Sequence, residues 1–141
     1  MLIREASNCI EIVAVRRVPQ HLPSAGDTEV SIQVSSSGFS GRGTAWVHAS
    51  RLAAFIAQLQ ELDQQRQGTA ALEGISREEF QLRIRSIDRQ GHFAVSGKLA
   101  CQVYADQRGP YLHAVEFGFE FDPTRLPEVA SGARALAGEL T

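Results

Sequence analysis

The sequence is poor in several features whose absence excludes whole classes of protein. It contains only 2 cysteines, Cys9 and Cys101, which form no CxxC pair. Each lies in an apolar strand pattern, so we expect reduced, buried thiols rather than a disulfide. No segment approaches the roughly 20 apolar residues of a membrane span, and charges at Arg4 and Glu5 disfavour a secretory signal. The sequence therefore predicts a cytoplasmic protein that does not contact a membrane.

An excess of positive charge is also missing. The formal net charge is -2 and the pI is about 6.1, so the chain has no general attraction to a phosphate backbone. We therefore expect no nucleic-acid partner. The length of 141 residues suits one domain, and no linker divides it, which predicts a single domain over residues 1–141.

The strongest pattern present is the alternation from Tyr111 to Phe121. Strand side chains alternate between two faces, so one face of this strand would be bulky and the other small or charged. The bulky set comprises Tyr111, His113, Val115, Phe117, Phe119 and Phe121. The strand leads directly through Asp122 into a helical stripe that begins near Leu126 and includes Val129, Ala130, Ala133 and Leu136.

Other strands are predicted over residues 9–18, 29–35, 44–48, 82–85 and 92–104, with residues 64–74 as a loop. The strand at 9–18 is rich in Ile and Val on both sides, which predicts cover on two faces. Ser50 is expected to cap a helix. The apolar stripe of this helix is Leu52, Phe55, Ile56, Leu59 and Leu62, and Gly68 is a plausible stop. Together these elements predict the α+β class, with an antiparallel sheet of about six or seven strands and two helices packed on one face.

The motif from Gly38 to Gly43 resembles a nucleophile elbow or a phosphate loop only superficially. Arg42 occupies the position where the elbow requires glycine, and the chain then continues as a strand. No Gly-Lys-Ser/Thr or GxGxxG motif accompanies it, so no cofactor is predicted. We interpret residues 35–43 as a flexible hairpin connection that presents Phe39 and Arg42 to a partner.

Catalytic and metal-binding arrangements are equally sparse. The histidines at 21, 48, 92 and 113 lack zinc-site spacing, so no metal is predicted, and His113 is expected in the core. Glu116 and Glu120 would lie roughly 13 Å apart along one strand, too far for a glycosidase pair. We instead expect them on an open sheet face beside Arg83, Arg85 and Lys98. Trp46 is expected to be buried under the first helix.

Two segments together resemble the WapI-type immunity proteins and related bacterial domains. The first runs from Gly43 through Trp46 to Phe55 and continues to Leu62, and the second runs from Tyr111 to Leu136. The resemblance implies a small cytoplasmic protein that binds a cognate polymorphic toxin without catalysis. The partner-binding candidates, taken from this chain alone, are Phe39, Arg42, Arg83, Arg85, Lys98, Glu116 and Glu120.

Two other functions remain open from the sequence. The first is a small-molecule-binding or hydrolytic enzyme with a pocket between sheet and helix, using Ser40 as nucleophile and His48 or His113 as base. The second is a homodimeric structural protein that pairs an exposed sheet edge or face. The oligomeric state is not fixed by any pattern in the chain.

Overall fold

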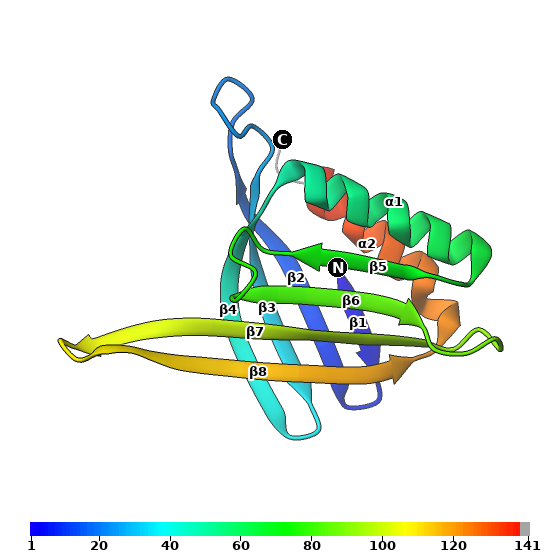
Figure 1. Ribbon diagram of the computed structural model, residues 1–141. Coiled ribbons are helices and arrows are strands. Elements are labelled where there is room, and N and C mark those ends of the chain that lie inside the picture. The colour runs from blue at the N-terminus through cyan, green and yellow to red at the C-terminus, as the bar shows by residue number, and fades with distance from the viewer. Residues whose placement is uncertain (139–141) are drawn as a thin grey trace.

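The computed structural model describes residues 1–138 (Figure 1). Within this range the chain forms eight strands, two α-helices and one 3₁₀ helix. In order they are β1 (Leu2–Glu5), β2 (Asn8–Arg17), β3 (Thr28–Ser36), β4 (Phe39–Val47), α1 (Ala49–Gln65), β5 (Thr69–Glu73), β6 (Phe80–Ser86), β7 (Phe93–Asp106), β8 (Gly109–Phe121), η1 (Pro123–Arg125) and α2 (Leu126–Gly138).

The strands form two antiparallel sheets of four, each in chain order. We call β1–β4 the N-terminal sheet and β5–β8 the C-terminal sheet. Strands of the two sheets cross, and β8 contacts β1, β3 and β4 (Figure 1). The predicted α+β class is confirmed. The described residues divide eight strands between two sheets, where the sequence predicted six or seven strands in one.

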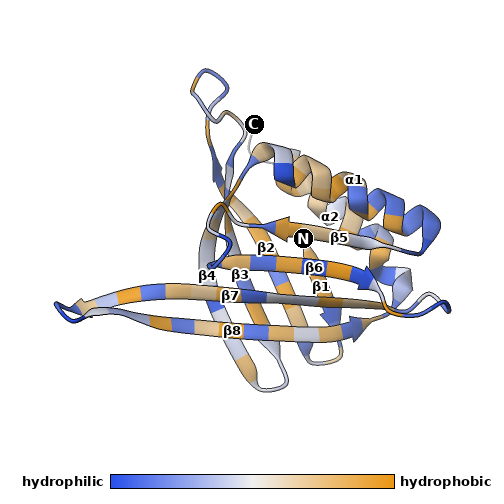
Figure 2. Cartoon of the chain, viewed as in Figure 1, coloured by the Kyte–Doolittle hydropathy of each residue, from blue (hydrophilic) through white to orange (hydrophobic). Residues whose placement is uncertain are grey.

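Period-two burial explains how the sheets share one core. Val30, Ile32 and Val34 of β3 are fully buried, while the polar residues between them lie on the outer face. Phe55 of α1 and Phe80 and Phe93 of the C-terminal sheet are also fully buried. Helix α1 packs on β5, α2 packs on β1, and the helices contact each other. Figure 2 shows apolar and polar residues alternating along the strands.

The β3–β4 hairpin corrects the expected flexible connection over residues 35–43. Only Ser37 and Gly38 form the turn, with φ of 52° and 83°, and strand pairing continues on both sides. Positive φ at both central residues is the requirement of a type I′ hairpin turn. The glycines in this segment, which suggested a loop, are instead required by close packing. A Cβ at Gly41 would lie 2.8 Å from Val115 Cγ1. Gly41 therefore allows β4 to approach the C-terminal sheet.

The expected loop over residues 64–74 was also wrong in part, because residues 69–73 form β5. This strand has only five residues, and its sequence does not alternate clearly between apolar and polar side chains, so it could not be recognised from the pattern. Ala70 and Leu72 are nevertheless fully buried. Pairing with β6 stabilises it. The short strand β1 was likewise missed, and it pairs with β2.

Helix α1 is capped by a residue distant in sequence rather than by Ser50. His48 is the N-cap residue and makes no side-chain cap bond. Instead, the carboxylate of Asp27 accepts a hydrogen bond from Ala49 N at 2.9 Å and lies 3.1 Å from His48 Nδ1. The loop between β2 and β3 thereby positions the start of α1.

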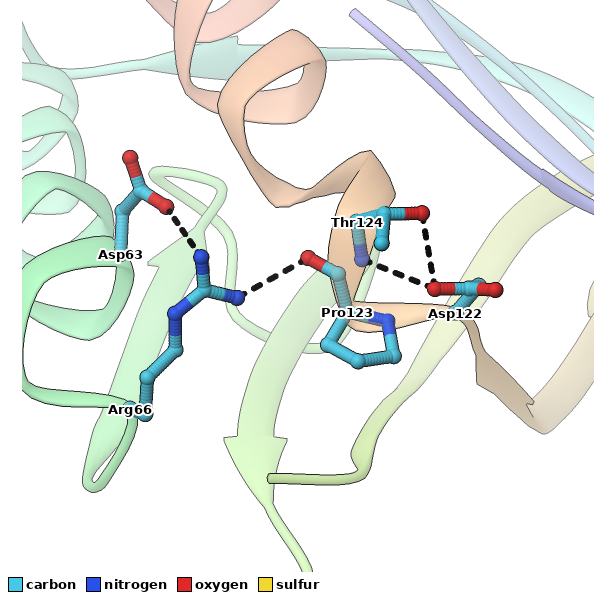
Figure 3. A network of polar contacts seen from close by, with 5 residues as sticks. All are labelled: Asp63, Arg66, Asp122, Pro123 and Thr124. Carbon is cyan, nitrogen blue, oxygen red and sulfur yellow. Dashed lines mark hydrogen bonds and ion pairs between the residues drawn. The ribbon is translucent and has the colours of Figure 1, made fainter. Parts of the chain in front are cut away.

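A second polar network connects the end of α1 to the start of the C-terminal helical segment (Figure 3). Arg66 adopts the left-handed conformation that ends α1, and its guanidinium donates to Asp63 Oδ1 at 3.2 Å and to Pro123 O at 3.0 Å. Asp122 accepts from Thr124 N at 2.9 Å and caps η1. These backbone and side-chain hydrogen bonds lower the pKa of Asp122. The predicted junction after Phe121 is thus a capped strand-to-helix turn.

The outer face of the N-terminal sheet contains several residues that were expected in the core. Trp46 is half-buried there, beneath the Arg16 guanidinium 5.3 Å from the ring centroid, rather than under α1. Val13 and Val15 are 47% and 49% exposed, so β2 is covered on one face only.

Of the two free cysteines, Cys9 is half-buried and Cys101 is exposed. The expectation of two buried thiols was therefore wrong.

Candidate partner-binding surface

Five of the predicted partner-binding residues lie together on the outer face of the C-terminal sheet. Lys98 stands directly opposite Glu116 in the β7–β8 ladder. Arg85 and Glu120 both pair with Ala94, one from each side, and Arg83 pairs with Ser96 between these two rows. The sequence therefore predicted this charged face correctly, because period-two alternation fixes which side chains share a side.

The electrostatics of this face leave most of its charges open to solvent. Lys98 Nζ lies 3.8 Å from Glu78, a contact too long and too exposed to hold the lysine firmly. Arg83 and Arg85 are exposed and form no ion pair among residues 1–138. A shallow depression of about 500 Å³, lined in part by Arg83, Lys98 and Glu116, opens on the same face.

The other two predicted residues lie apart from this charged face. Phe39, next to the β3–β4 turn, is 71% exposed. Arg42 lies on β4, on the outer face of the N-terminal sheet, and donates to Gln33 Oε1 at 3.3 Å. Both are presented to solvent as expected, but from a regular strand rather than a loop.

A third exposed region was missed from the sequence. Residues 101–112, which we call the arm, are the distal part of the β7–β8 hairpin and extend past β4 (Figure 1). The arm exposes large apolar side chains: Val103 (43%), Tyr104 (72%), Tyr111 (50%) and Leu112 (62%). Val103 and Tyr111 pair on one face of the hairpin, whereas Tyr104 and Leu112 lie on the other, so both faces of the arm expose large apolar side chains.

The arm also corrects the expectation that Tyr111 and His113 lie in the core. The alternation from Tyr111 to Phe121 is real, and Phe117, Phe119 and Phe121 are buried. The N-terminal sheet ends beneath Val115, so Tyr111 and His113 of the same face are exposed. The sequence signal for the arm was the length of the β7–β8 hairpin. Strands β7 and β8 have 14 and 13 residues, whereas β6 has only 7, so the end of the hairpin extends beyond its neighbour in the sheet.

The proposed serine–histidine chemistry finds little geometric support. Ser40 and His48 are eight residues apart on β4 and its extension, roughly 26 Å at 3.3 Å per residue. His48 is also engaged with Asp27. Ser40 and His113 line one depression of about 430 Å³ beside the arm, but no hydrogen bond joins them in the described chain. Nucleophile, base and orienting acid are therefore not assembled there.

The described residues contain no group of three His, Cys, Asp or Glu side chains able to hold a metal ion. A hydrogen bond between Asp88 and His92 at the β6–β7 turn lowers the pKa of Asp88 and raises that of His92. Both groups are exposed and bond within their own turn, which gives them a local structural role. No helix within residues 1–138 combines the length and apolarity needed to cross a membrane.

Comparison with known families supports one of the functions that the sequence left open. A family model described as the immunity protein WapI-like family matches residues 1–139. The chain belongs to this family. Comparisons with curated proteins and with solved structures give no significant match. The resemblance seen in the two sequence segments is confirmed, and membership supports an immunity-type role for this WapI-like protein.

Proposed function

We propose that this WapI-like protein binds a cognate polymorphic toxin directly in the cytoplasm and blocks it without catalysis. The observation that carries the proposal is the family match over residues 1–139. Because the match spans nearly the whole chain, the role belongs to the domain as a whole rather than to an inserted motif.

The exposed features of the structure fit a binding protein. The charged outer face of the C-terminal sheet presents Arg83 and Arg85, which form no ion pair with any other residue of the described range 1–138. Such groups steer a partner of complementary charge and raise its association rate. The arm adds tyrosines, which are enriched among residues that dominate binding energy.

Of the two candidate bases, His48 has a structural position, and His113 lines the same depression as Ser40 without a hydrogen bond to it among residues 1–138. His48 and Asp27 hold the start of α1, and Asp88 and His92 stabilise a turn. Ser40 lies at the turn end of β4, far along the strand from His48. Steric and electrostatic blockade of a toxin requires none of these groups to react.

Co-expression with a candidate toxin domain, sought in the genes adjacent to the one for this chain, tests the proposal. Wild-type protein is expected to restore growth and to co-purify with the toxin domain. Arg83→Glu and Arg85→Glu, each made singly, are expected to slow association, and Arg134→Glu, which reverses one exposed charge on α2, is the matched control. Growth restored without a complex, together with chemical modification of the toxin, would favour an enzyme instead.

A further inference from the structure

Strand β4 has a free edge with unused hydrogen-bonding groups. β4 pairs only with β3, whereas the edge strands β1 and β5 contact α2 and α1. Trp46 O accepts from Ile75 N at 2.7 Å, so the backbone groups of Trp46 point away from β3. Backbone groups of alternate residues share a direction, so those of Ser40, Arg42 and Thr44 also point outward. Within residues 1–138 these outward groups have no backbone partner.

This edge lacks the features that usually prevent strand addition. Natural edges are blunted by charges, proline, bulges or short length. β4 runs for nine residues in continuous register with β3, contains no proline, and carries Arg42 as its single charged residue. By contrast, β8, the outer strand of the C-terminal sheet, carries Pro110, Glu116 and Glu120. The β4 edge is therefore the better template for another strand.

The arm overhangs the position that an added strand would occupy. Leu99 and Val115 pack against Gly43 and Gly41 of β4. Two residues further along the hairpin, Cys101 pairs with His113 and continues the same face, and Val103 pairs with Tyr111 beyond it. Strands in a sheet are about 4.8 Å apart, and same-face residues on the arm advance about 7 Å. The face of Cys101 and His113 thus covers the next strand position beyond β4.

Two depressions lie along the β4 edge beside the arm. One depression of about 430 Å³ opens on the Ser40 side of the crossing, and another of about 680 Å³ opens on the Thr44 side. Both are lined by Arg42, Gly43 and Cys101. An extended chain paired with β4 would run from one depression to the other.

We infer that an extended segment of the toxin adds to the free edge of β4 as a fifth strand, clamped by the arm. This inference rests on the proposed function and names its binding mode. The segment has small residues facing Cys101 and His113, because β4 itself uses glycines where the arm crosses it. An acidic residue faces Arg42 on the outer side, since opposite charges stabilise cross-strand pairs.

Charge complementarity favours this occupant over a second copy of the chain. Arg42 contacts Gln33 and forms no ion pair within the described residues. β4 contains neither aspartate nor glutamate, so β4 paired with β4 would leave both copies of Arg42 without an acidic neighbour. A toxin strand that carries a carboxylate supplies what this edge lacks.

Proline at Thr44 tests the inference directly. Thr44→Pro removes an outward N–H and blocks the edge but leaves the β3 ladder intact. Thr44→Val is the matched control, because it keeps the N–H and the approximate shape. By titration calorimetry with the toxin domain, Thr44→Pro is expected to weaken binding about 10- to 100-fold, as for one lost hydrogen bond that leaves a carbonyl of the toxin strand unpaired. Thr44→Val is expected to bind like wild type, and Arg42→Glu is expected to bind more weakly.

Amide hydrogen exchange on the wild-type complex keeps the test independent of the folding of the proline variant. The amides of Ser40, Arg42 and Thr44 should become protected when the toxin binds. Equal binding by Thr44→Pro and Thr44→Val, or unprotected amides in the complex, would overturn the edge-strand inference alone. A dimer of the free chain that Thr44→Pro dissociates would replace the toxin with a second copy. Failure of wild type to bind would overturn the proposed function as well.

Discussion

Replacement of Gly41 by alanine tests how closely the two sheets must approach. The new Cβ would lie 2.8 Å from Val115 Cγ1, closer than carbon atoms pack. Val115 is β-branched, so its side chain cannot rotate away freely. Overpacking of this kind costs about 1–3 kcal/mol. Replacing glycine by alanine at an extended position also stabilises the fold by about 0.4–1 kcal/mol, because alanine lowers the conformational entropy of the unfolded chain.

The expected net effect of Gly41→Ala is therefore a loss of about 0.5–2 kcal/mol of unfolding free energy. Urea denaturation measures it as a midpoint lowered by roughly 0.3–1 M, for a slope near 2 kcal/mol/M. Gly43→Ala is the matched control. Its Cβ would lie 3.3 Å from Leu99 Cδ1, the flexible end of a side chain, so the expected change is within about 0.5 kcal/mol of wild type.

A double-mutant cycle identifies the cause of the loss. Val115→Ala removes the clashing methyl group, so the double variant should be more stable than the sum of the single changes by about 0.5–2 kcal/mol. If Gly41→Ala is as stable as wild type, or if Val115→Ala gives no such coupling, the close crossing of β4 and the hairpin is refuted.

Three other experiments test separate parts of the fold. Asp27→Ala should lower the free energy of unfolding in urea by about 0.5–2 kcal/mol, because it removes the cap of α1. Ser50→Ala should change this free energy little. A larger loss for Ser50→Ala than for Asp27→Ala would contradict the cap assignment. Phe55→Ala should cost about 3–5 kcal/mol, because its side chain is fully buried; a loss below 1 kcal/mol would argue against that packing. The stabilisation of the turn by protonated His92 is complete below the ordinary histidine pKa of about 6.5 and is lost as pH rises through the raised pKa of His92. The stabilisation by ionised Asp88 is lost as pH falls through the lowered pKa of Asp88. The turn is thus most stable in mild acid, and NMR titration should give a His92 midpoint above 6.5 that Asp88→Asn lowers; an unchanged midpoint would exclude the pair.

Side-chain alternation was the most informative pattern in the sequence. It correctly predicted the buried residues of β3, the aromatic half of β8 and the charged outer face that carries Lys98 and Glu116. These features depend on neighbours in the same strand and on one repeating period. The apolar stripe of α1 was predicted for the same reason, with Leu52, Phe55 and Leu59 buried.

Features set by distant contacts were not predictable from local patterns. Gly41 and Gly43 looked like loop residues, although they are strand residues that admit the side chains of another sheet. The cap of α1 comes from Asp27, 22 positions before Ala49. The exposure of Tyr111 depends on where the N-terminal sheet ends, which no residue near Tyr111 encodes. Hairpin length was the one sequence signal for the arm, and the free edge of β4 could be identified only from the structure.

The central claim is that the protein acts by binding a toxin, and a calorimetric titration with an inhibition assay tests it most directly. Purified protein is titrated into a candidate toxin domain from an adjacent gene while toxin activity is followed in the same samples. Direct blockade predicts a one-to-one complex and a loss of toxin activity proportional to the fraction bound. An active toxin domain that shows no heat of binding, or one that is inactivated by a small catalytic amount of this protein, would contradict it.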